Sequence, residues 1–136
     1  MKGIQTRQYE MAELCFTGKK PAGSEVEVDL EAVFVHDGTS TAVKGFYAGN
    51  STYKVRFLPE FSGEYHYTVK GSVLEAPVEG VLKVESAAEG RHGPVRAEGT
   101  HLRCADGAYF YSFGTTIYAL AHQSEALIEE TLESLS

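Results

Sequence analysis

The side chains with the most versatile chemistry in this 136-residue chain are five histidines and two cysteines. A zinc site needs ligands at close, paired spacings such as His-x-x-x-His. The histidines, at wide and unpaired spacings, are His36, His66, His92, His101 and His122. We therefore predict no metal site, and no motif indicates a cofactor.

Cys104 lies near His101 and Asp106 in the sequence, so it could be a nucleophile with a neighbouring base. These residues fall in one predicted hairpin, which offers neither a third orienting group nor a cleft. A structural cysteine is therefore the better interpretation. The only other cysteine is Cys15, and secreted disulfide-rich domains usually carry more. Two reduced, mostly buried thiols are favoured, and a Cys15–Cys104 disulfide is the alternative.

Acidic residues alternate with apolar ones over residues 25–32, which is typical of a half-buried strand with a solvated carboxylate face. Such a face could hold a cation or dock a partner, but solvation and protection of the strand from pairing are the usual roles. The chain carries 19 Asp+Glu against 12 Lys+Arg, a net charge of −7. This balance disfavours binding to nucleic acid or to an anionic membrane. The glycines show no phosphate-loop spacing.

Aromatic rings could bind a sugar by stacking on its apolar face. The rings predicted to point inward are Tyr53, Phe57, Tyr65 and Tyr67. The rings predicted to be exposed in turns are Phe46, Tyr47 and Phe61. Since most rings point inward and the chain has no Trp, independent sugar binding is the rival hypothesis rather than the favoured one.

The elements that position these residues are short strands. Apolar residues recur with a period of two, in runs bounded by turn signals such as Asp37-Gly38. The predicted strands cover residues 9–16, 25–36, 41–47, 53–57, 64–69 and 81–84. This pattern predicts an all-β fold, an antiparallel β-sandwich, over residues 1–88.

The pattern changes after a Gly- and Pro-bearing linker at residues 89–95. A hairpin is predicted to turn at Asp106-Gly107, and residues 109–120 are nearly continuous in apolar side chains, as in a strand covered on both faces. Ser124 is a good N-cap for an amphipathic helix that follows. One strand and one helix cannot bury both faces of that strand. We therefore expect residues 96–136 to be cut from a longer α/β domain.

Residues 45–47, 53–59 and 63–67 resemble the immunoglobulin-like domain, of unknown function, that precedes the catalytic (β/α)8 barrel in a family of bacterial proteins assigned as glycoside hydrolases. Residues 90–96 and 113–123 resemble the entry to that barrel, its first strand and its first loop. The resemblance runs from about residue 10 to the end of the chain. Many relatives carry Trp where this chain has Tyr65 and Leu120, which weakens the case for a stacking platform at Leu120.

The resemblance implies a parent enzyme that hydrolyses a glycosidic bond with two carboxylates, placed at the ends of later barrel strands. No catalytic residue is assigned to this chain, and we expect it to be inactive alone. In such a barrel Tyr118, His122 and Gln123 would lie at the active-site face and contact substrate. The alternative is a core tyrosine and a loop-capping histidine.

The expected function is therefore that of a non-catalytic N-terminal accessory domain, which packs against and positions the barrel of the same polypeptide. Two alternatives stay open: a carbohydrate-binding module for an oligosaccharide, and an immunoglobulin-like interaction or dimerisation module. The apolar residues after 95 are expected to dock on the sandwich or on a second copy of the chain. The first residues form no apolar signal region, so if Met1 is the natural start the expected location is the cytoplasm.

Overall fold

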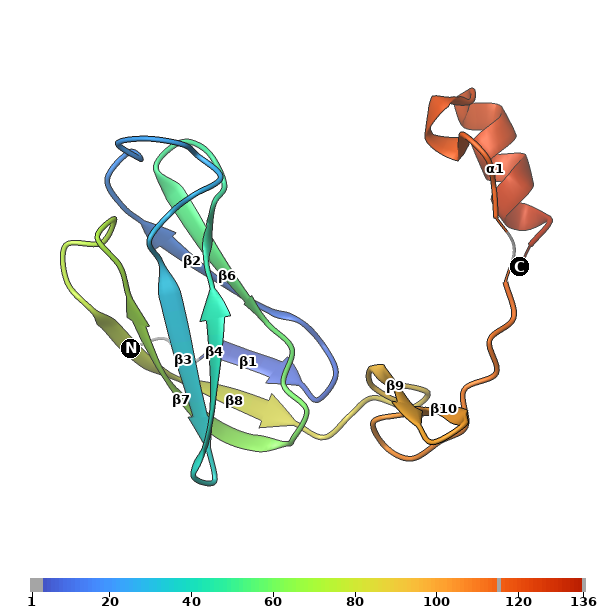
Figure 1. The fold of residues 1–136 in the computed structure, drawn as a ribbon, viewed down its shortest axis with the longest axis horizontal. Helices are drawn as coiled ribbons and strands as arrows, with labels where there is room; N and C mark the ends of the chain where they lie inside the picture. Colours follow the sequence, from blue (N-terminus) through green and yellow to red (C-terminus); the bar gives the residue numbers. More distant parts are fainter. Residues whose placement is uncertain (1–3, 115, 136) are drawn as a thin grey trace.

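The computed structural model, which describes residues 4–114 and 116–135, contains a sandwich of two β-sheets (Figure 1). The larger sheet has the strand order β1 (Ile4–Arg7), β8 (Val78–Glu85), β7 (Gly63–Lys70), β3 (Glu31–His36) and β4 (Thr39–Lys44). The smaller sheet has the order β2 (Ala12–Thr17), β6 (Thr52–Phe57) and β5 (Phe46–Tyr47). The predicted all-β sandwich is confirmed.

The core fills the space between the sheets because alternate residues of each strand point to the same side. The residues of β6 and β7 that were predicted to point inward are all buried: Tyr53, Val55, Phe57, Tyr65, Tyr67 and Val69. Phe34 of β3 and Phe57 of β6 stack with their ring centroids 3.9 Å apart and their planes within 6°. This pair joins the two sheets within the core.

Two turns set the path of the chain around this core. Asp37 and Gly38 have φ values of 46° and 78°, so they form the predicted two-residue turn between β3 and β4. The predicted strand over residues 41–47 is instead divided at Gly45, where the chain leaves the larger sheet for the smaller one. The Gly45 N–H donates to the Leu30 carbonyl at 2.8 Å, and a Cβ at Gly45 would lie 2.4 Å from Leu30 Cδ2.

The prediction of a strand over residues 25–30 is wrong. These residues are irregular, and Val26 is 90% exposed. The ladder begins only at Glu31, which pairs with Lys44 at the end of β4 and with Lys70 at the end of β7. Before Glu31 the Leu30 carbonyl still accepts the Gly45 N–H and the Asp29 carboxylate accepts the Ser72 N–H, but these single contacts do not extend the ladders. The acidic side chains of this stretch face solvent, as predicted.

The N-terminal strands also differ from the sequence interpretation. In place of one strand over residues 9–16, β1 and β2 flank a turn in which Tyr9 has a φ of 65°. β1 runs parallel to β8, with Ile4 opposite Leu82, whereas the other pairings of named strands in the described residues are antiparallel. Local alternation does not indicate such a long-range pairing.

The chain after the sandwich forms a separate hairpin of β9 (Val95–Glu98) and β10 (His101–Cys104), which the sequence did not suggest. The predicted turn at Asp106-Gly107 follows it, and the Phe110 N–H donates back to the Leu102 carbonyl at 3.0 Å. The turn is confirmed, although the ladder beside it is reduced to a single bridge between Arg103 and Tyr109.

The prediction of a buried strand over residues 109–120 is wrong for the described part of that range; residue 115 lies outside the described residues. Residues 111–114 and 116–117 have no ladder, and Phe113 is 100% exposed. A strand of this composition needs a neighbour at its edges and a cover on its faces. The hairpin and the sandwich supply neither, so the segment runs out from them as Figure 1 shows.

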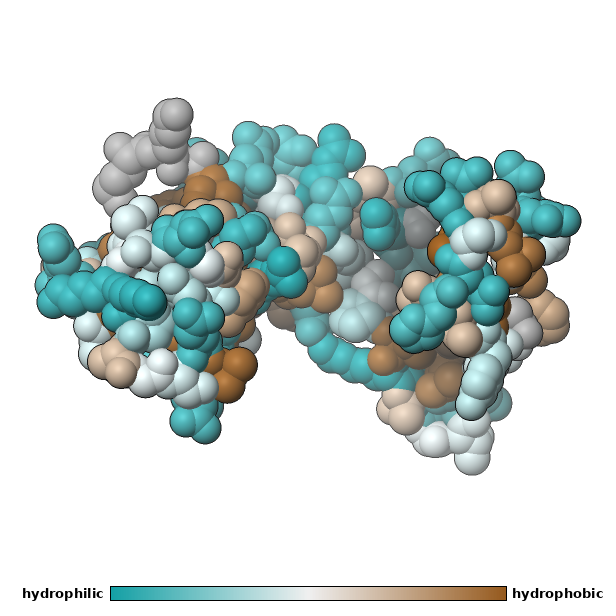
Figure 2. Space-filling view, turned by 90° about the horizontal axis from the view of Figure 1, so that it is seen from above, coloured by the Kyte–Doolittle hydropathy of each residue, from teal (hydrophilic) through white to brown (hydrophobic). Residues whose placement is uncertain are grey.

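The predicted helix is confirmed as α1 (Glu125–Glu133), preceded by the short 3-10 helix η1 (Leu120–His122). The Ser124 hydroxyl accepts a hydrogen bond from the Leu127 N–H at 3.4 Å, as expected of an N-cap. Leu127, Leu132 and Leu135 are exposed. Figure 2 shows hydrophobic atoms at the surface of the right-hand part of the molecule, which carries this helix.

Candidate functional site

The three residues predicted to contact substrate lie together on the segment that leads into α1. Tyr118 precedes a turn at Ala119, whose φ is 56°; His122 ends η1, and Gln123 caps it. The His122 N–H donates to the Ala119 carbonyl at 2.9 Å, which closes the turn. Tyr118 is 92% exposed, and both other side chains face solvent. Their role in a sugar site stays a prediction.

A more enclosed site lies where the sandwich meets the β9–β10 hairpin. We call it the junction pocket. It has a volume of about 460 Å³, which is within the usual range for small-molecule sites. Its lining comes from the ends of β3 and β4 with their turn, from the ends of β6 and β7 with their loop, and from one residue of β9: His36, Asp37, Thr39, Thr41, Phe57, Leu58, Glu60, Phe61, Tyr65 and Arg96.

The wall of the junction pocket is aromatic. The His36 ring stacks on Tyr65 with centroids 4.4 Å apart, and on Phe61 with centroids 6.0 Å apart. The three rings therefore form layers, with the buried Tyr65 at one end and Phe61, which is 61% exposed, at the other. Burial raises the pKa of Tyr65, so its phenol keeps its proton at neutral pH.

Two contacts hold the linker and the hairpin against the sandwich at this pocket. The Arg96 guanidinium donates to the Glu60 carboxylate. Within the sandwich, the Gln8 side-chain amide donates to the Glu60 carbonyl at 2.7 Å, which ties down the loop that carries Glu60. Gly93, with a φ of 76°, packs so closely on Tyr9 that a Cβ there would lie 2.6 Å from the tyrosine ring. The hairpin is therefore fixed to the sandwich by both charge and packing.

The linker also contacts the turn that follows the hairpin. His92 Nδ1 lies 2.7 Å from the Asp106 carboxylate, and the Asp106 N–H donates to the His92 carbonyl at 3.3 Å. The pKa of Asp106 is lowered, first because its carboxylate accepts the Ala108 N–H and then because it pairs with His92. The carboxylate is therefore ionised over a wide range of pH and can hold the linker in place.

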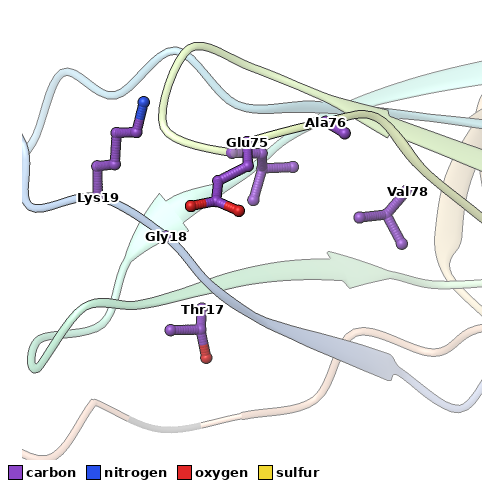
Figure 3. A pocket seen from close by; sticks show the side chains of 7 residues that line it. Thr17, Gly18, Lys19, Glu75, Ala76 and Val78 are labelled. Carbon is purple, nitrogen blue, oxygen red and sulfur yellow. The ribbon is translucent and has the colours of Figure 1, made fainter.

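A second cavity, of about 510 Å³, lies at the opposite end of the sandwich, where β2 ends and β7 turns into β8. Lys19 and Glu75 flank it, and Figure 3 shows their charged groups pointing in different directions. The Tyr53 hydroxyl donates to the Lys19 carbonyl, which holds this residue of the lining in place. Its lining, which includes Leu74 and Val78, contains no aromatic ring, so it has no wall on which a planar or cyclic ligand could stack.

The cysteines contribute to neither cavity. Both are free thiols, so the predicted reduced state is confirmed. Cys15 is exposed, however, so its predicted burial is wrong, and Cys104 is half-buried. Cys15 alternates with the buried Leu14 along β2 and pairs with Lys54, and so it takes the outer face of the smaller sheet.

In the described ranges, 4–114 and 116–135, no group of three or more His, Cys, Asp or Glu side chains is arranged to hold a metal ion. No helix within these ranges combines the length and the apolar composition needed to cross a bilayer.

The sequence interpretation missed most of the junction. The sequence indicates that Phe61 is an exposed ring, but it gives no sign that His36, Glu60 and Arg96 lie beside it. The contact between Glu60 and Arg96 spans 36 residues, and that between Tyr9 and Gly93 spans even more of the chain. The one available signal was Gly93 itself, a glycine placed before a proline in the linker.

Comparisons with known proteins point to one family. Residues 5–72 match the family described as "Domain of unknown function (DUF5060)", which is half of the chain. A solved structure of a putative glycoside hydrolase from Bacteroides vulgatus ATCC 8482 is 33% identical over 96% of this chain, with a TM-score of 0.85. The chain spans about a quarter (26%) of the length of that protein.

Other comparisons add little. The surface layer protein SbsC, domains 1-6, is 14% identical, with a TM-score of 0.44; the match covers 83% of this chain and 16% of that protein. A similarity this weak supports no inference. No curated protein matches the chain.

Proposed function

Because the chain belongs to the DUF5060 family, we propose that it is a non-catalytic, N-terminal accessory domain of a glycoside hydrolase. In this proposal residues 1–88 are an immunoglobulin-like sandwich, residues 89–95 a linker and residues 96–136 the entry to a catalytic (β/α)8 barrel. The partner of the sandwich is the barrel of the same polypeptide, which it holds in position.

The observation that carries this proposal is the similarity to the Bacteroides vulgatus protein. It extends over 96% of this chain, beyond the sandwich and into the segment that follows, but over only 26% of that protein. A chain whose counterpart is about a quarter of a longer protein is suited to an accessory role. The residues that match the family, 5–72, contain seven of the eight sandwich strands in whole or part and none of the hairpin.

The structure supports the positioning role through the hairpin and the segment after it. The hairpin is fixed to the sandwich by Arg96 on Glu60 and by Gly93 on Tyr9. The segment beyond it exposes large apolar or aromatic side chains: Tyr109, Phe110, Tyr111, Phe113 and Tyr118. Contiguous exposed apolar surface is typical of an interaction face. A barrel that begins in this segment would cover it.

Two experiments test the proposal. The 136-residue chain, assayed on a panel of aryl-glycosides, is expected to show no hydrolysis, and turnover would contradict the non-catalytic role. The reading frame that continues this chain is expected to encode repeated βα units with Asp or Glu at strand ends. A continuation without such repeats would overturn the proposed parent enzyme.

The positioning role has a sharper test in Gly93→Ala, with Gly90→Ala as its matched control. Both glycines have nearly the same φ, 76° and 77°, so the backbone strain of the two variants is alike. A Cβ at Gly93 meets the Tyr9 ring, whereas a Cβ at Gly90 meets nothing within 4 Å. Only Gly93→Ala is expected to speed hydrogen exchange at the Asp106 amide, which bonds to His92. Equal exchange rates in the two variants would refute a fixed junction.

A further inference from the structure

The junction pocket offers a rigid aromatic platform. The Phe61 N–H donates to the Tyr65 hydroxyl at 3.0 Å, which fixes the loop that carries the exposed ring. His36 Nδ1 lies 3.0 Å from the Glu64 carbonyl. Gly63 has a φ of 124°, and a Cβ there would lie 2.8 Å from the His36 ring. The Phe61 and His36 rings are therefore held in place before any ligand arrives, which lowers the entropic cost of binding.

Around these rings the rim of the junction pocket is polar. Asp37 and Glu60 supply carboxylates, Thr39 and Thr41 supply hydroxyls, and Arg96 supplies a guanidinium. Carboxylates accept hydrogen bonds, a guanidinium donates them, and a hydroxyl can do both. A ligand with many hydroxyls can satisfy such a rim in several directions at once.

The charge of the rim narrows the class of ligand. Arg96 is already paired with Glu60, and Asp37 adds a second carboxylate, which lies 3.6 Å from His36 Nε2. Two carboxylates against one guanidinium give the rim an excess of negative charge. Like charges repel, so phosphates and uronic acids are disfavoured relative to neutral ligands.

We propose that the junction pocket binds a neutral sugar ring of an oligosaccharide. A pyranose has an apolar face of C–H groups and a rim of hydroxyls, which match the exposed face of Phe61 and the polar side chains beside it. The site lies where the sandwich meets the hairpin, so a bound glycan would run along the junction. This inference goes beyond the accessory role, which requires no ligand.

The test is a titration of the 136-residue chain, observed through its backbone amides by NMR. The probes are neutral oligosaccharides (cellohexaose, xylohexaose, mannohexaose and galactohexaose) and one acidic probe, an oligogalacturonate. A neutral probe is expected to shift the amides of Asp37, Thr39 and Phe61. Phe61→Ala is expected to weaken binding roughly tenfold.

The matched control is Phe46→Ala, which removes another exposed ring, one that lies near the Arg56 guanidinium on the smaller sheet. It is expected to leave the affinity unchanged. The proposal is overturned if no neutral probe shifts these amides at about 10 mM, if Phe61→Ala binds as well as the parent chain, or if the acidic probe alone binds. None of these outcomes bears on the accessory role, whose tests use turnover and amide exchange at Asp106.

Discussion

Replacing Phe34 by alanine tests the packing that joins the two sheets. Phe34 is 1% exposed, stacks on Phe57 at 3.9 Å and lies 5.7 Å from the Tyr67 ring. Truncating a buried phenylalanine to alanine costs about 3–5 kcal/mol, because it removes buried area and leaves a cavity. Since a domain of this kind has a stability of only about 5–15 kcal/mol, the free energy of unfolding should fall by about a fifth or more.

The measurement is urea unfolding followed by circular dichroism, because the chain has no Trp for fluorescence. With a slope of about 1.5 kcal/mol per molar urea, the midpoint should fall by roughly 2–3 M. Phe34→Leu, which keeps most of the volume, should cost less than half as much. Phe46→Ala, at the exposed surface, should cost less than about 1 kcal/mol. A loss below about 1 kcal/mol for Phe34→Ala would refute the central role of the stack.

Two further predictions concern charge and association. Glu13 accepts hydrogen bonds from Lys54 at 2.6 Å and Arg56 at 2.9 Å, which lower its pKa. A lowered folded-state pKa gives stability that is present above the ordinary value of about 4.3 and is lost as the pH falls through the folded-state pKa. Glu13→Gln should therefore lower the urea midpoint at pH 7, and the midpoints of the variant and the parent chain should converge in acid. A difference in midpoint that stays constant with pH would contradict this. The exposed Phe113 and Tyr118 should make the isolated chain self-associate as its concentration rises in analytical ultracentrifugation, and the double variant Phe113→Ser/Tyr118→Ser should stay monomeric. A parent chain that is monomeric at every concentration would exclude a homo-oligomer formed through this segment.

Much of the sandwich could be predicted because its signals are local. The alternation in β6 and β7 identifies which residues point inward, since successive side chains of a strand take opposite faces. Asp37-Gly38 specifies its own turn, and Ser124 caps its own helix, because each acts on residues no more than three positions away. The fold class and most inward residues follow from such patterns.

The errors arose where a pattern needs a distant partner. Residues 25–30 alternate like a strand, but the ladders that would extend them end at Lys44 and Lys70. Residues 109–120 are apolar like a buried strand, but within the described residues no neighbouring strand forms a ladder with them. Alternation states which side of a strand is apolar; it does not state whether a neighbouring strand is present.

The sequence by itself determined the all-β sandwich, the faces of its central strands, the helix start and the family resemblance. Only the tertiary structure decided the division of the chain at Gly45, the parallel pairing of β1 and the junction pocket. The physical reason is that Phe61, His36 and Arg96 come from three separate elements, and their side chains meet only after both sheets have packed and the hairpin has been fixed by Glu60 and Tyr9.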